Sequence, residues 1–386
     1  MLKPRERIVR ALCVEEADEI PTFEKWFAPP TADAVLGRPS IVHCIPRQYE
    51  LLAEDKLDKL LKAQLEDNID FAKQLKWSAI SVGTNPTRKY NPKAFRKISE
   101  NIWRIGERIV FCNPKTQYIV EMGTSEIGRG GLEALKAHVE GLEAIKPDEN
   151  LESFSVLQNT VKRLKEENLD IFIFGGAGVS IPNTADWFTL FLRCLYTYPD
   201  LIKRYMRACL KFAIVTCETA VELGCDGILS GGDLAYKHGP MISPKQYKEF
   251  VLPYVKVLSD AAHRKGAFIA SASDGNLWPI IDDYLINSDI DGELELEPSA
   301  GMDLGALKER FGERRCLIGN VDCGYTLVFG TPQQITRETT ECIMKAAHGG
   351  GYILQSSNAI HGGVKPENYF TMIEALRKYN RYPIPQ

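Results

Sequence analysis

The sequence lacks the features that mark membrane-spanning and secreted proteins. No apolar run approaches the roughly 18–20 residues that a bilayer-spanning helix needs. Residues 1–7 contain no apolar stretch of the kind found in secretory signals. The ten cysteines include no Cys-x-x-Cys pair, and disulfide frameworks are typical of short secreted chains instead. These absences predict a cytoplasmic protein with reduced thiols.

Several catalytic motifs are also missing. The glycines at 175–178 do not complete Gly-x-Gly-x-x-Gly, because Ile181 stands where the last glycine or alanine should be. The chain contains no Gly-x-x-x-x-Gly-Lys-Ser/Thr, no His-Glu-x-x-His and no Gly-x-Ser-x-Gly. The sequence therefore gives no support to a P-loop nucleotide enzyme, a zincin protease or a serine hydrolase.

An excess of charge of one sign is absent too. The 47 Lys and Arg nearly balance the 51 Asp and Glu, which leaves a formal net charge of −4. This balance makes nucleic acid or an anionic membrane a poor candidate for the principal partner. The 44% hydrophobic content is enough to fill a sizeable core.

The pattern of apolar residues decides the fold class. At about 150 residues per domain, 386 residues allow two or three domains or one large barrel. Short apolar runs, each followed by a stretch of helical periodicity, are typical of parallel β-α units covered on both faces. Such runs lie at 170–174, 227–229, 267–270, 292–296, 316–319 and 352–354, and 78–82 is a further candidate. The helices expected between and after them lie at about 155–167, 198–223, 244–265, 276–287, 303–311, 332–347 and 366–379. They predict an α/β protein with a (β/α)8 TIM barrel; an open doubly wound sheet is the alternative.

The first third of the chain is less regular. A short helix is expected at 3–14, and helical periodicity runs from about 47 to 76. Apolar stretches at 102–105, 108–111 and 118–122, with turn residues between them, predict a small β-meander. No linker or repeat divides the chain. We therefore expect one domain over 1–386, with an N-terminal elaboration and the first strands in about 1–125 and regular βα units in about 150–380.

Polar residues gather where the predicted strands end. Active sites of TIM barrels lie at this end of the strands. The residues concerned are Asp233, Tyr236, His238, Asp274, Asn276, Glu293, Glu295, Glu297, Asn320, Asp322, Cys323, Asn358 and His361. Such a mixture can serve acid–base chemistry or hold a hard or borderline metal ion.

Some of these residues have a structural alternative. Asp274 and Asn276 could cap a helix that begins near Leu277, and Asn320 could orient a tight loop. Glu295 and Glu297, by contrast, alternate with apolar residues on one predicted strand. They would point into the barrel, where burying unpaired carboxylates is costly.

Several segments together resemble the uroporphyrinogen decarboxylase superfamily. They are 231–244 (GGDLAYKHGPMISP), 273–276 (SDGN), 297–303 (EPSAGMD), 319–322 (GNVD) and 349–354 (GGGYIL), with 5–7 (RER) and 20–21 (IP) near the start. The order and spacing match over about 220–380. The resemblance implies a (β/α)8 barrel. It also implies either decarboxylation of a porphyrinogen or methyl transfer to or from the cobalamin of a corrinoid protein.

The resemblance favours methyl transfer. True decarboxylases of this group carry an arginine-rich N-terminal motif that holds the porphyrinogen carboxylates. The equivalent segment here, 21–27 (PTFEKWF), contains aromatic residues and no arginine. We therefore predict a methyltransferase acting with a corrinoid partner protein on a small methylated substrate such as an aryl methyl ether. A decarboxylase or lyase of a small carboxylic acid and a non-catalytic binding homologue remain alternatives.

The resemblance leaves zinc open. Methyltransferases of this group generally use zinc as a Lewis acid, but Ala272 stands where relatives often have histidine, and the later cysteine is absent from 349–351. A different ligand set could come from Asp233, His238, Glu295, Glu297, Cys323 and His361. Asp233, Glu297, Asp274 and His238 are the candidate catalytic residues. The candidate substrate-binding residues are Trp26, Phe27, Trp187, Tyr236, Asn276, Asn320, Asn358 and His361. The sequence leaves a homodimer open.

Overall fold

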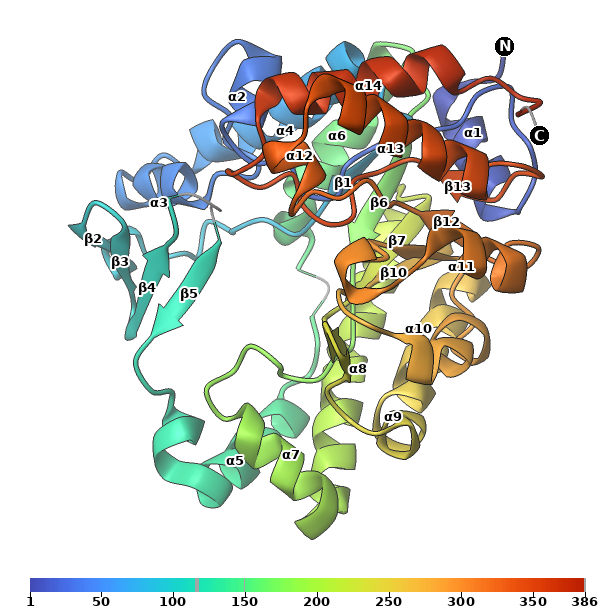
Figure 1. Ribbon diagram of the computed structural model, residues 1–386. Coiled ribbons are helices and arrows are strands. Elements are labelled where there is room, and N and C mark those ends of the chain that lie inside the picture. Colours follow the sequence, from blue (N-terminus) through green and yellow to red (C-terminus); the bar gives the residue numbers. More distant parts are fainter. Residues whose placement is uncertain (115–117, 149, 385–386) are drawn as a thin grey trace.

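The computed structural model describes residues 1–114, 118–148 and 150–384, and its centre is a curled parallel sheet with helices on the outside (Figure 1). Seven strands lie side by side in chain order, and every neighbouring pair is parallel. They are β1 (Ala79–Val82), β6 (Phe172–Gly176), β7 (Gly227–Gly231), β10 (Phe268–Ala272), β11 (Gly292–Leu294), β12 (Cys316–Ile318) and β13 (Tyr352–Ile353). All seven coincide with predicted apolar runs.

The segment 21–27 closes the curled sheet. Leu354 N donates to Pro21 O at 3.0 Å, and Ser78 N donates to Thr22 O at 2.8 Å. Thr22 thereby stands between the end of β13 and the start of β1 and takes the place of an eighth strand. The strands follow one another round the barrel without the reversal of order that an open doubly wound sheet requires. The prediction of a TIM-barrel fold is confirmed.

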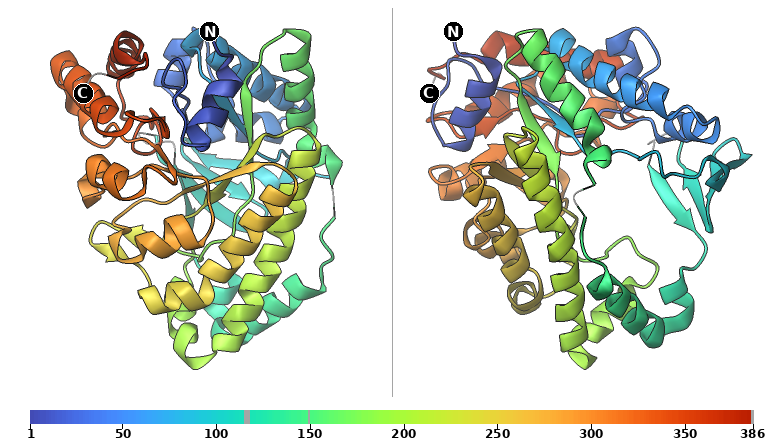
Figure 2. Two further views of the ribbon diagram at one scale, coloured as in Figure 1. Left: turned by 90° about the vertical axis from the view of Figure 1, so that its right-hand side faces the viewer. Right: turned by 180° about the vertical axis from the view of Figure 1, so that it is seen from behind.

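Helices cover the outer surface of the barrel (Figure 2). They are α1 (Pro4–Leu12), α2 (Thr31–Leu36), α3 (Ile45–Ala53), α4 (Leu57–Leu75), α5 (Glu126–Ala144), α6 (Ser155–Glu166), α7 (Phe188–Thr197), α8 (Pro199–Glu222), α9 (Pro244–Phe250), α10 (Leu252–Arg264), α11 (Leu304–Phe311), α12 (Thr326–Phe329), α13 (Pro332–Ala346) and α14 (Pro366–Tyr379). The segment after α14 pairs with the segment after α1, because Tyr382 N donates to Asp18 O at 3.2 Å and Ile20 N donates to Asn380 O at 2.7 Å.

Some helix predictions need correction. The stretch expected at 244–265 is two helices, because Pro253 has no amide hydrogen to continue the first one. The periodicity at 47–76 likewise belongs to α3 and α4, which are separated by Asp55 at φ 56°. The helix expected at 276–287 is a short 3₁₀ turn (Trp278–Ile280) and a π-helical turn (Asp283–Asn287).

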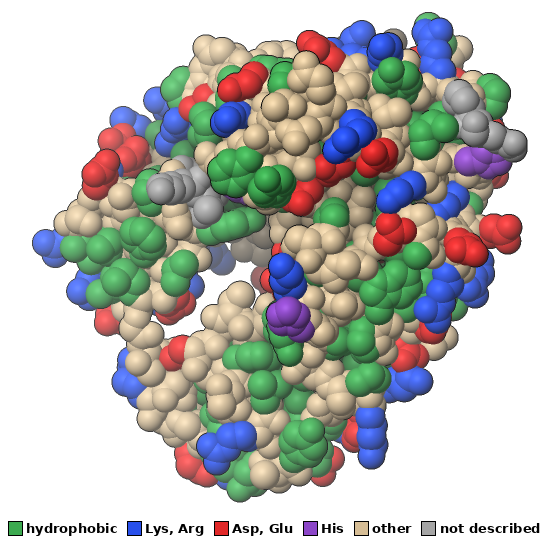
Figure 3. All heavy atoms as spheres, in the orientation of Figure 1, with side chains coloured by type: hydrophobic (Ala, Val, Ile, Leu, Met, Phe, Trp, Pro, Cys, Tyr) green, Lys and Arg blue, Asp and Glu red, His purple; other side chains and the backbone are tan. Residues whose placement is uncertain are grey.

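The predicted meander is present as an antiparallel sheet of four strands, one more than expected. They are β2 (Phe95–Ser99), β3 (Ile102–Ile105), β4 (Arg108–Cys112) and β5 (Ile119–Met122). Trp103, Val110 and Cys112 form its own small core against Tyr49 of α3. The sheet stands beside the barrel mouth (Figure 1). The space-filling view shows a hollow between this sheet and the region of α5 and α7 (Figure 3).

The barrel interior is packed with large side chains below the mouth. Phe23, Phe172 and Phe174 are fully buried, and Phe23 stacks on Phe174 with ring centroids 5.3 Å apart. This packing fills the lower barrel, so ligand space is confined to the carboxyl ends of the strands. In the part of the chain that the structure describes, no helix is long and apolar enough to cross a bilayer.

Candidate active site

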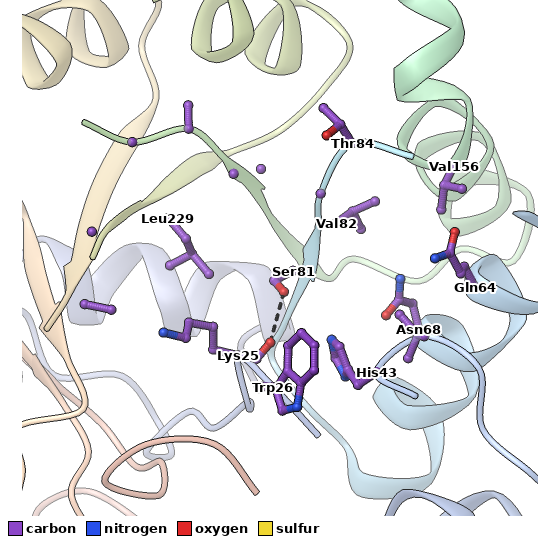
Figure 4. Close-up of a pocket in the computed structure, with 18 of the residues that line it drawn as sticks. Lys25, Trp26, His43, Gln64, Asn68, Ser81, Val82, Thr84, Val156 and Leu229 are labelled. Carbon is purple, nitrogen blue, oxygen red and sulfur yellow. Dashed lines mark hydrogen bonds between the residues drawn. The ribbon is translucent and has the colours of Figure 1, made fainter. Parts of the chain in front are cut away.

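Two cavities open at the barrel mouth. The larger has a volume of about 700 Å³ and is lined by the ends of β1, β6 and β7 and by residues of α3 and α4. Lys25 extends across it, and the Trp26 ring lies against His43, with ring centroids 4.8 Å apart (Figure 4). Burial lowers the pKa of His43 to about 4, and its Nδ1 accepts from Phe27 N at 3.0 Å. His43 is therefore a neutral wall residue at ordinary pH.

The second cavity has a volume of about 430 Å³ and lies on the other side of the mouth. Its lining includes residues of the loops after β10, β11, β12 and β13. They are Asp274, Glu297, Ser299, Asp322, Cys323, Gly324, Tyr325, Ser357, Asn358 and His361, with Tyr118 reaching in from the loop before β5. Six residues predicted from strand ends thus share one cavity: Asp274, Glu297, Asp322, Cys323, Asn358 and His361.

A cluster of carboxylates lies at the mouth. Asp233, Asp274 and Glu295 place one oxygen each within 4.8 Å of one another, and we call these three residues the acid cluster. Lys25 Nζ lies 2.5 Å from Glu295 Oε1. One ammonium group therefore offsets part of a concentrated negative charge. All three belong to the larger polar set that the sequence places at the ends of the strands.

An irregular backbone aims Glu295 into the cluster. The strand expected at 292–296 ends at Leu294, because Glu295 and Leu296 have φ values of 83° and 42°. Such left-handed conformations cost energy for residues with a Cβ and need support from their surroundings. Asn320 Nδ2 supplies it by donating to Leu296 O at 2.7 Å and to Met302 O at 3.2 Å. Glu295 and Glu297 therefore do not share one strand face, as the alternation had indicated.

The charges of the cluster shift the pKa values of its members. The pKa of Asp274 is raised to about 8. Burial is the largest cause, followed by the neighbouring Glu295, Asp233 and Glu297. Burial lowers the pKa of Lys25, but the ion pair with Glu295 and the charges of Asp274 and Asp233 outweigh it and leave that pKa raised. At neutral pH the site accordingly holds a protonated Asp274 beside a charged Lys25.

The capping alternative for Asp274 is settled by its contacts. Asn276 Oδ1, and not Asp274, accepts from Trp278 N at 3.1 Å and caps the short 3₁₀ turn. Asp274 Oδ2 instead accepts from the Asn358 side-chain amide. Asp274 Oδ1 is buried and has no hydrogen-bond partner among the described residues. This oxygen is available to a ligand in the mouth.

Other predicted residues lie outside the two cavities. Phe27 is fully buried against Phe71, Trp77 and Tyr369. Trp187 packs on Phe191 and Tyr205 beside α8.

Three further candidates occupy other positions. Tyr236 and His238 are exposed and contact each other, with ring centroids 6.2 Å apart. Asn320 is buried, and its amide is occupied by the backbone carbonyls that it supports. Among the described residues, no hydrogen bond or ion pair joins these three side chains to a carboxylate of the acid cluster, and Asn320 acts only on the backbone beside Glu295.

The described residues do not bring the predicted sulfur and nitrogen ligands of zinc to the acid cluster. Cys323 lies in the loop after β12, where Ser357 Oγ lies 3.5 Å from its Sγ. His361 Nε2 lies 3.1 Å from Cys323 O, and its Nδ1 accepts from Gly363 N. The acid cluster offers only oxygen atoms, and the Lys25 ammonium already lies against one of them. This arrangement does not fit the predicted zinc site; zinc stays a prediction that metal analysis of the purified protein tests.

Sequence reasoning missed Lys25 and Glu24. Both lie in a segment that contains proline and aromatic residues and that we took for a loop. The available signal was two adjacent charges inside an apolar run. The glycines at 175–178, which do not complete a nucleotide-binding motif, line the larger cavity.

The fold and the site together define the class. A parallel barrel with acidic side chains and a lysine at the carboxyl ends of its strands is the arrangement of a TIM-barrel enzyme. Residues 120–379 match the family model described as uroporphyrinogen decarboxylase (URO-D). The chain belongs to this family.

The similarities to individual proteins are distant. Uroporphyrinogen decarboxylase of Pseudoalteromonas atlantica is 20% identical over 259 residues, which are 63% of this chain and 68% of that protein. The enzyme of Neisseria meningitidis is 21% identical over 197 residues, 48% of this chain and only 51% of that protein. A solved structure of a methyltransferase from Methanosarcina mazei superposes with a TM-score of 0.69 at 17% identity, covering 98% of this chain and 99% of the other.

Proposed function

We propose that the protein transfers a methyl group between a small methylated substrate, such as an aryl methyl ether, and the cobalamin of a corrinoid partner protein. The charge of the barrel mouth carries this proposal. Three acidic side chains, of which Asp274 is protonated, face one lysine, and no arginine occurs among the described residues lining either cavity. A porphyrinogen with many carboxylates would meet net repulsion here, whereas a neutral ether would not.

The larger cavity is open enough for a broad cofactor. Gly83 and Gly176 line it, and a Cβ added at either position would meet no atom within 4 Å. Side chains there would therefore project into the cavity. A reduced corrinoid, when bound, would supply the nucleophile that accepts the methyl group. The methyltransferase with the same fold from Methanosarcina mazei supports this assignment at the level of the fold.

Asp274 is suited to protonate the leaving group. Methyl transfer from an ether breaks the methyl–oxygen bond and leaves its electron pair on the oxygen, which needs a proton to depart as an alcohol. Asp274 Oδ1 is buried and unpartnered in the described structure, and the raised pKa of about 8 keeps the carboxyl protonated at neutral pH. Asp274 gives this proton to the oxygen as general acid, and solvent then restores it.

Lys25 and Asn358 prepare the site for this step. The Lys25 ammonium offsets the charge of Glu295, so the developing negative oxygen meets less repulsion. The Asn358 amide holds Asp274 Oδ2 and so leaves Oδ1 for the substrate. Both contacts exist before any ligand binds, which is the condition for preorganised electrostatic stabilisation.

Decarboxylation of a small carboxylic acid is the second candidate. It is favoured by Lys25, whose side chain extends into the larger cavity (Figure 4) and could hold one carboxylate, and by the curated relatives that are uroporphyrinogen decarboxylases. Release of CO₂ from a panel of small carboxylic acids, without any corrinoid, would identify this activity.

A direct assay tests the proposal. The purified protein is incubated with methoxylated aromatics and with free reduced cobalamin in place of the partner, and methylation is followed by absorbance. We expect substrate-dependent methylation together with release of the demethylated phenol. If the folded protein gives neither methyl transfer nor CO₂ release, the proposal is wrong and a non-catalytic homologue is favoured.

Gly176→Leu should block the larger cavity. The new side chain would enter open space at the end of β6, so we expect methyl transfer to fall at least about tenfold while the thermal midpoint changes little. Gly141→Leu is the matched control, because Gly141 is exposed on α5 and is equally free of neighbours. Equal activity of the two variants would show that this cavity is not used.

A further inference from the structure

Glu24 is a buried acid that the proposed reaction does not use. It lies in the segment that closes the barrel, one residue before Lys25, and only 1% of its surface is exposed. Its carboxyl meets residue Ser356, which follows β13 and lies 332 positions further along the chain. Ser356 N donates to Glu24 Oε1 at 3.3 Å, and Ser356 Oγ lies 2.7 Å from Glu24 Oε2.

A count of protons determines the state of this carboxyl. Ser356 Oγ also lies 2.5 Å from the backbone oxygen of Asn358. A serine hydroxyl has one proton to donate, and a backbone carbonyl can only accept. One proton cannot serve both contacts. With the Ser356 proton in the shorter contact, to Asn358 O, the contact with Glu24 Oε2 takes its proton from the carboxyl.

We infer that Glu24 is a neutral carboxylic acid that donates from Oε2 to Ser356 Oγ and serves as a positioning residue for Asp274. Its hydrogen bonds fix the turn 356–358 against the segment that carries Lys25. The Asn358 side chain of that turn holds Asp274 Oδ2. Glu24 therefore sets the relative position of the lysine and the acid of the mouth. The positioning role rests on the proposed function, whereas the neutral state of the Glu24 carboxyl does not.

The surroundings of Glu24 support a neutral carboxyl. Burial raises its pKa to about 8, although the bond from the Ser356 backbone N–H works in the opposite direction. Tyr369 of α14 and Cys323 of the loop after β12 are the other titratable groups that face it. Burial also raises the pKa of both, to about 12 for Cys323, so they stay neutral in the same pH range. Lys25, the adjacent residue of its own segment, is paired with Glu295.

The test compares the pH dependence of unfolding of the wild type with that of Glu24→Gln. Glutamine keeps a donor and an acceptor but cannot ionise. Between the ordinary glutamate pKa and about pH 8, native wild type holds a proton that the unfolded chain has lost. Its stability therefore falls as pH rises. The wild-type unfolding constant should rise relative to that of Glu24→Gln by about tenfold per pH unit from pH 5 to 8, and then level off.

Other buried acids titrate in the wild type and in Glu24→Gln alike. Their contributions therefore cancel in the ratio of the two unfolding constants. Glu133→Gln is the control, because the Glu133 side chain is 80% exposed on α5, and its ratio to the wild type should not change with pH. Glu24→Ala should be less stable than Glu24→Gln at every pH. If the ratio of the wild-type unfolding constant to that of Glu24→Gln does not change between pH 5 and 8, Glu24 is ionised and the inference is wrong.

A second measurement covers the case in which Glu24→Gln does not fold. Infrared difference spectra of the wild type and Ser356→Ala report the carbonyl stretch of protonated carboxyl groups. Loss of the Ser356 hydroxyl should shift this band, because it removes the acceptor of the Glu24 proton. If instead the only change lies in a carboxylate band, Glu24 is ionised and the inference is wrong.

Discussion

Asp274→Asn should slow methyl transfer from an ether substrate by about 10²–10⁴-fold, the range usual for loss of a general acid. The amide has nearly the same shape and can still accept from Asn358, so the fold should persist. It has no acidic proton for the leaving oxygen. Single-turnover rates of cobalamin methylation, measured with the wild type and the variant at pH 7, give the ratio. A change smaller than about threefold would remove Asp274 from the mechanism.

The pH profile adds a second criterion for Asp274. The residue must be protonated to act, and burial with its neighbours raises its pKa to about 8. The wild-type rate should therefore be level below about pH 8 and fall above it, whereas the residual rate of Asp274→Asn should lack this fall. Glu297→Gln is a control in the same cavity. Glu297 Oε2 accepts from Gly275 N at 3.1 Å, a bond that glutamine can keep, and the expected loss is below about tenfold.

Lys25→Met should destabilise the protein by about 2–3 kcal/mol. Removing one partner of a buried ion pair costs about 3–5 kcal/mol, because the remaining charge stays buried without compensation. The Glu295 side chain is 4% exposed, but that of Lys25 is 33% exposed toward the mouth, which places the cost below that range. Denaturant unfolding at pH 7, with the wild type measured alongside, gives the difference.

A double variant separates the contribution of charge to this loss of stability from the contribution of packing. In Lys25→Met/Glu295→Gln the unpaired carboxylate is gone, so we expect at least half of the lost stability to return. A double variant no more stable than Lys25→Met would mean that the pair contributes through the lysine methylenes and not through charge. The same double variant keeps Asp274 and therefore leaves the proton donor in place.

The barrel strands could be predicted because their apolar runs are short, buried on both faces and each followed by a helix. The segment 21–27 escaped this pattern, since it joins the barrel through a few backbone bonds and contains a proline and two charged residues. Helix α5 was missed for a related reason. Its first turns contain Gly128, Gly130 and Gly131, which weaken helical propensity.

The site could be predicted only as far as strand ends allow. Asp233, Asp274 and Glu295 follow different strands, and a parallel barrel brings their positions to one mouth. The direction of each side chain depends on the local backbone conformation, which the sequence does not reveal. Cys323 and His361 share a cavity, but His361 turns toward a carbonyl. Glu295 reaches the acid cluster only because Asn320 stabilises a left-handed backbone beyond β11.

The closure of the barrel by segment 21–27 has a consequence for the order of folding. The closure joins residues that are far apart along the chain, such as Glu24 and Ser356, which are 332 positions apart. Contacts of such long sequence separation form only after a large loss of chain entropy. The mouth, with its lysine and its acids, must therefore be completed late, after the central βα units have already packed. A chain stopped before β13 would keep much of its core but would have no finished site.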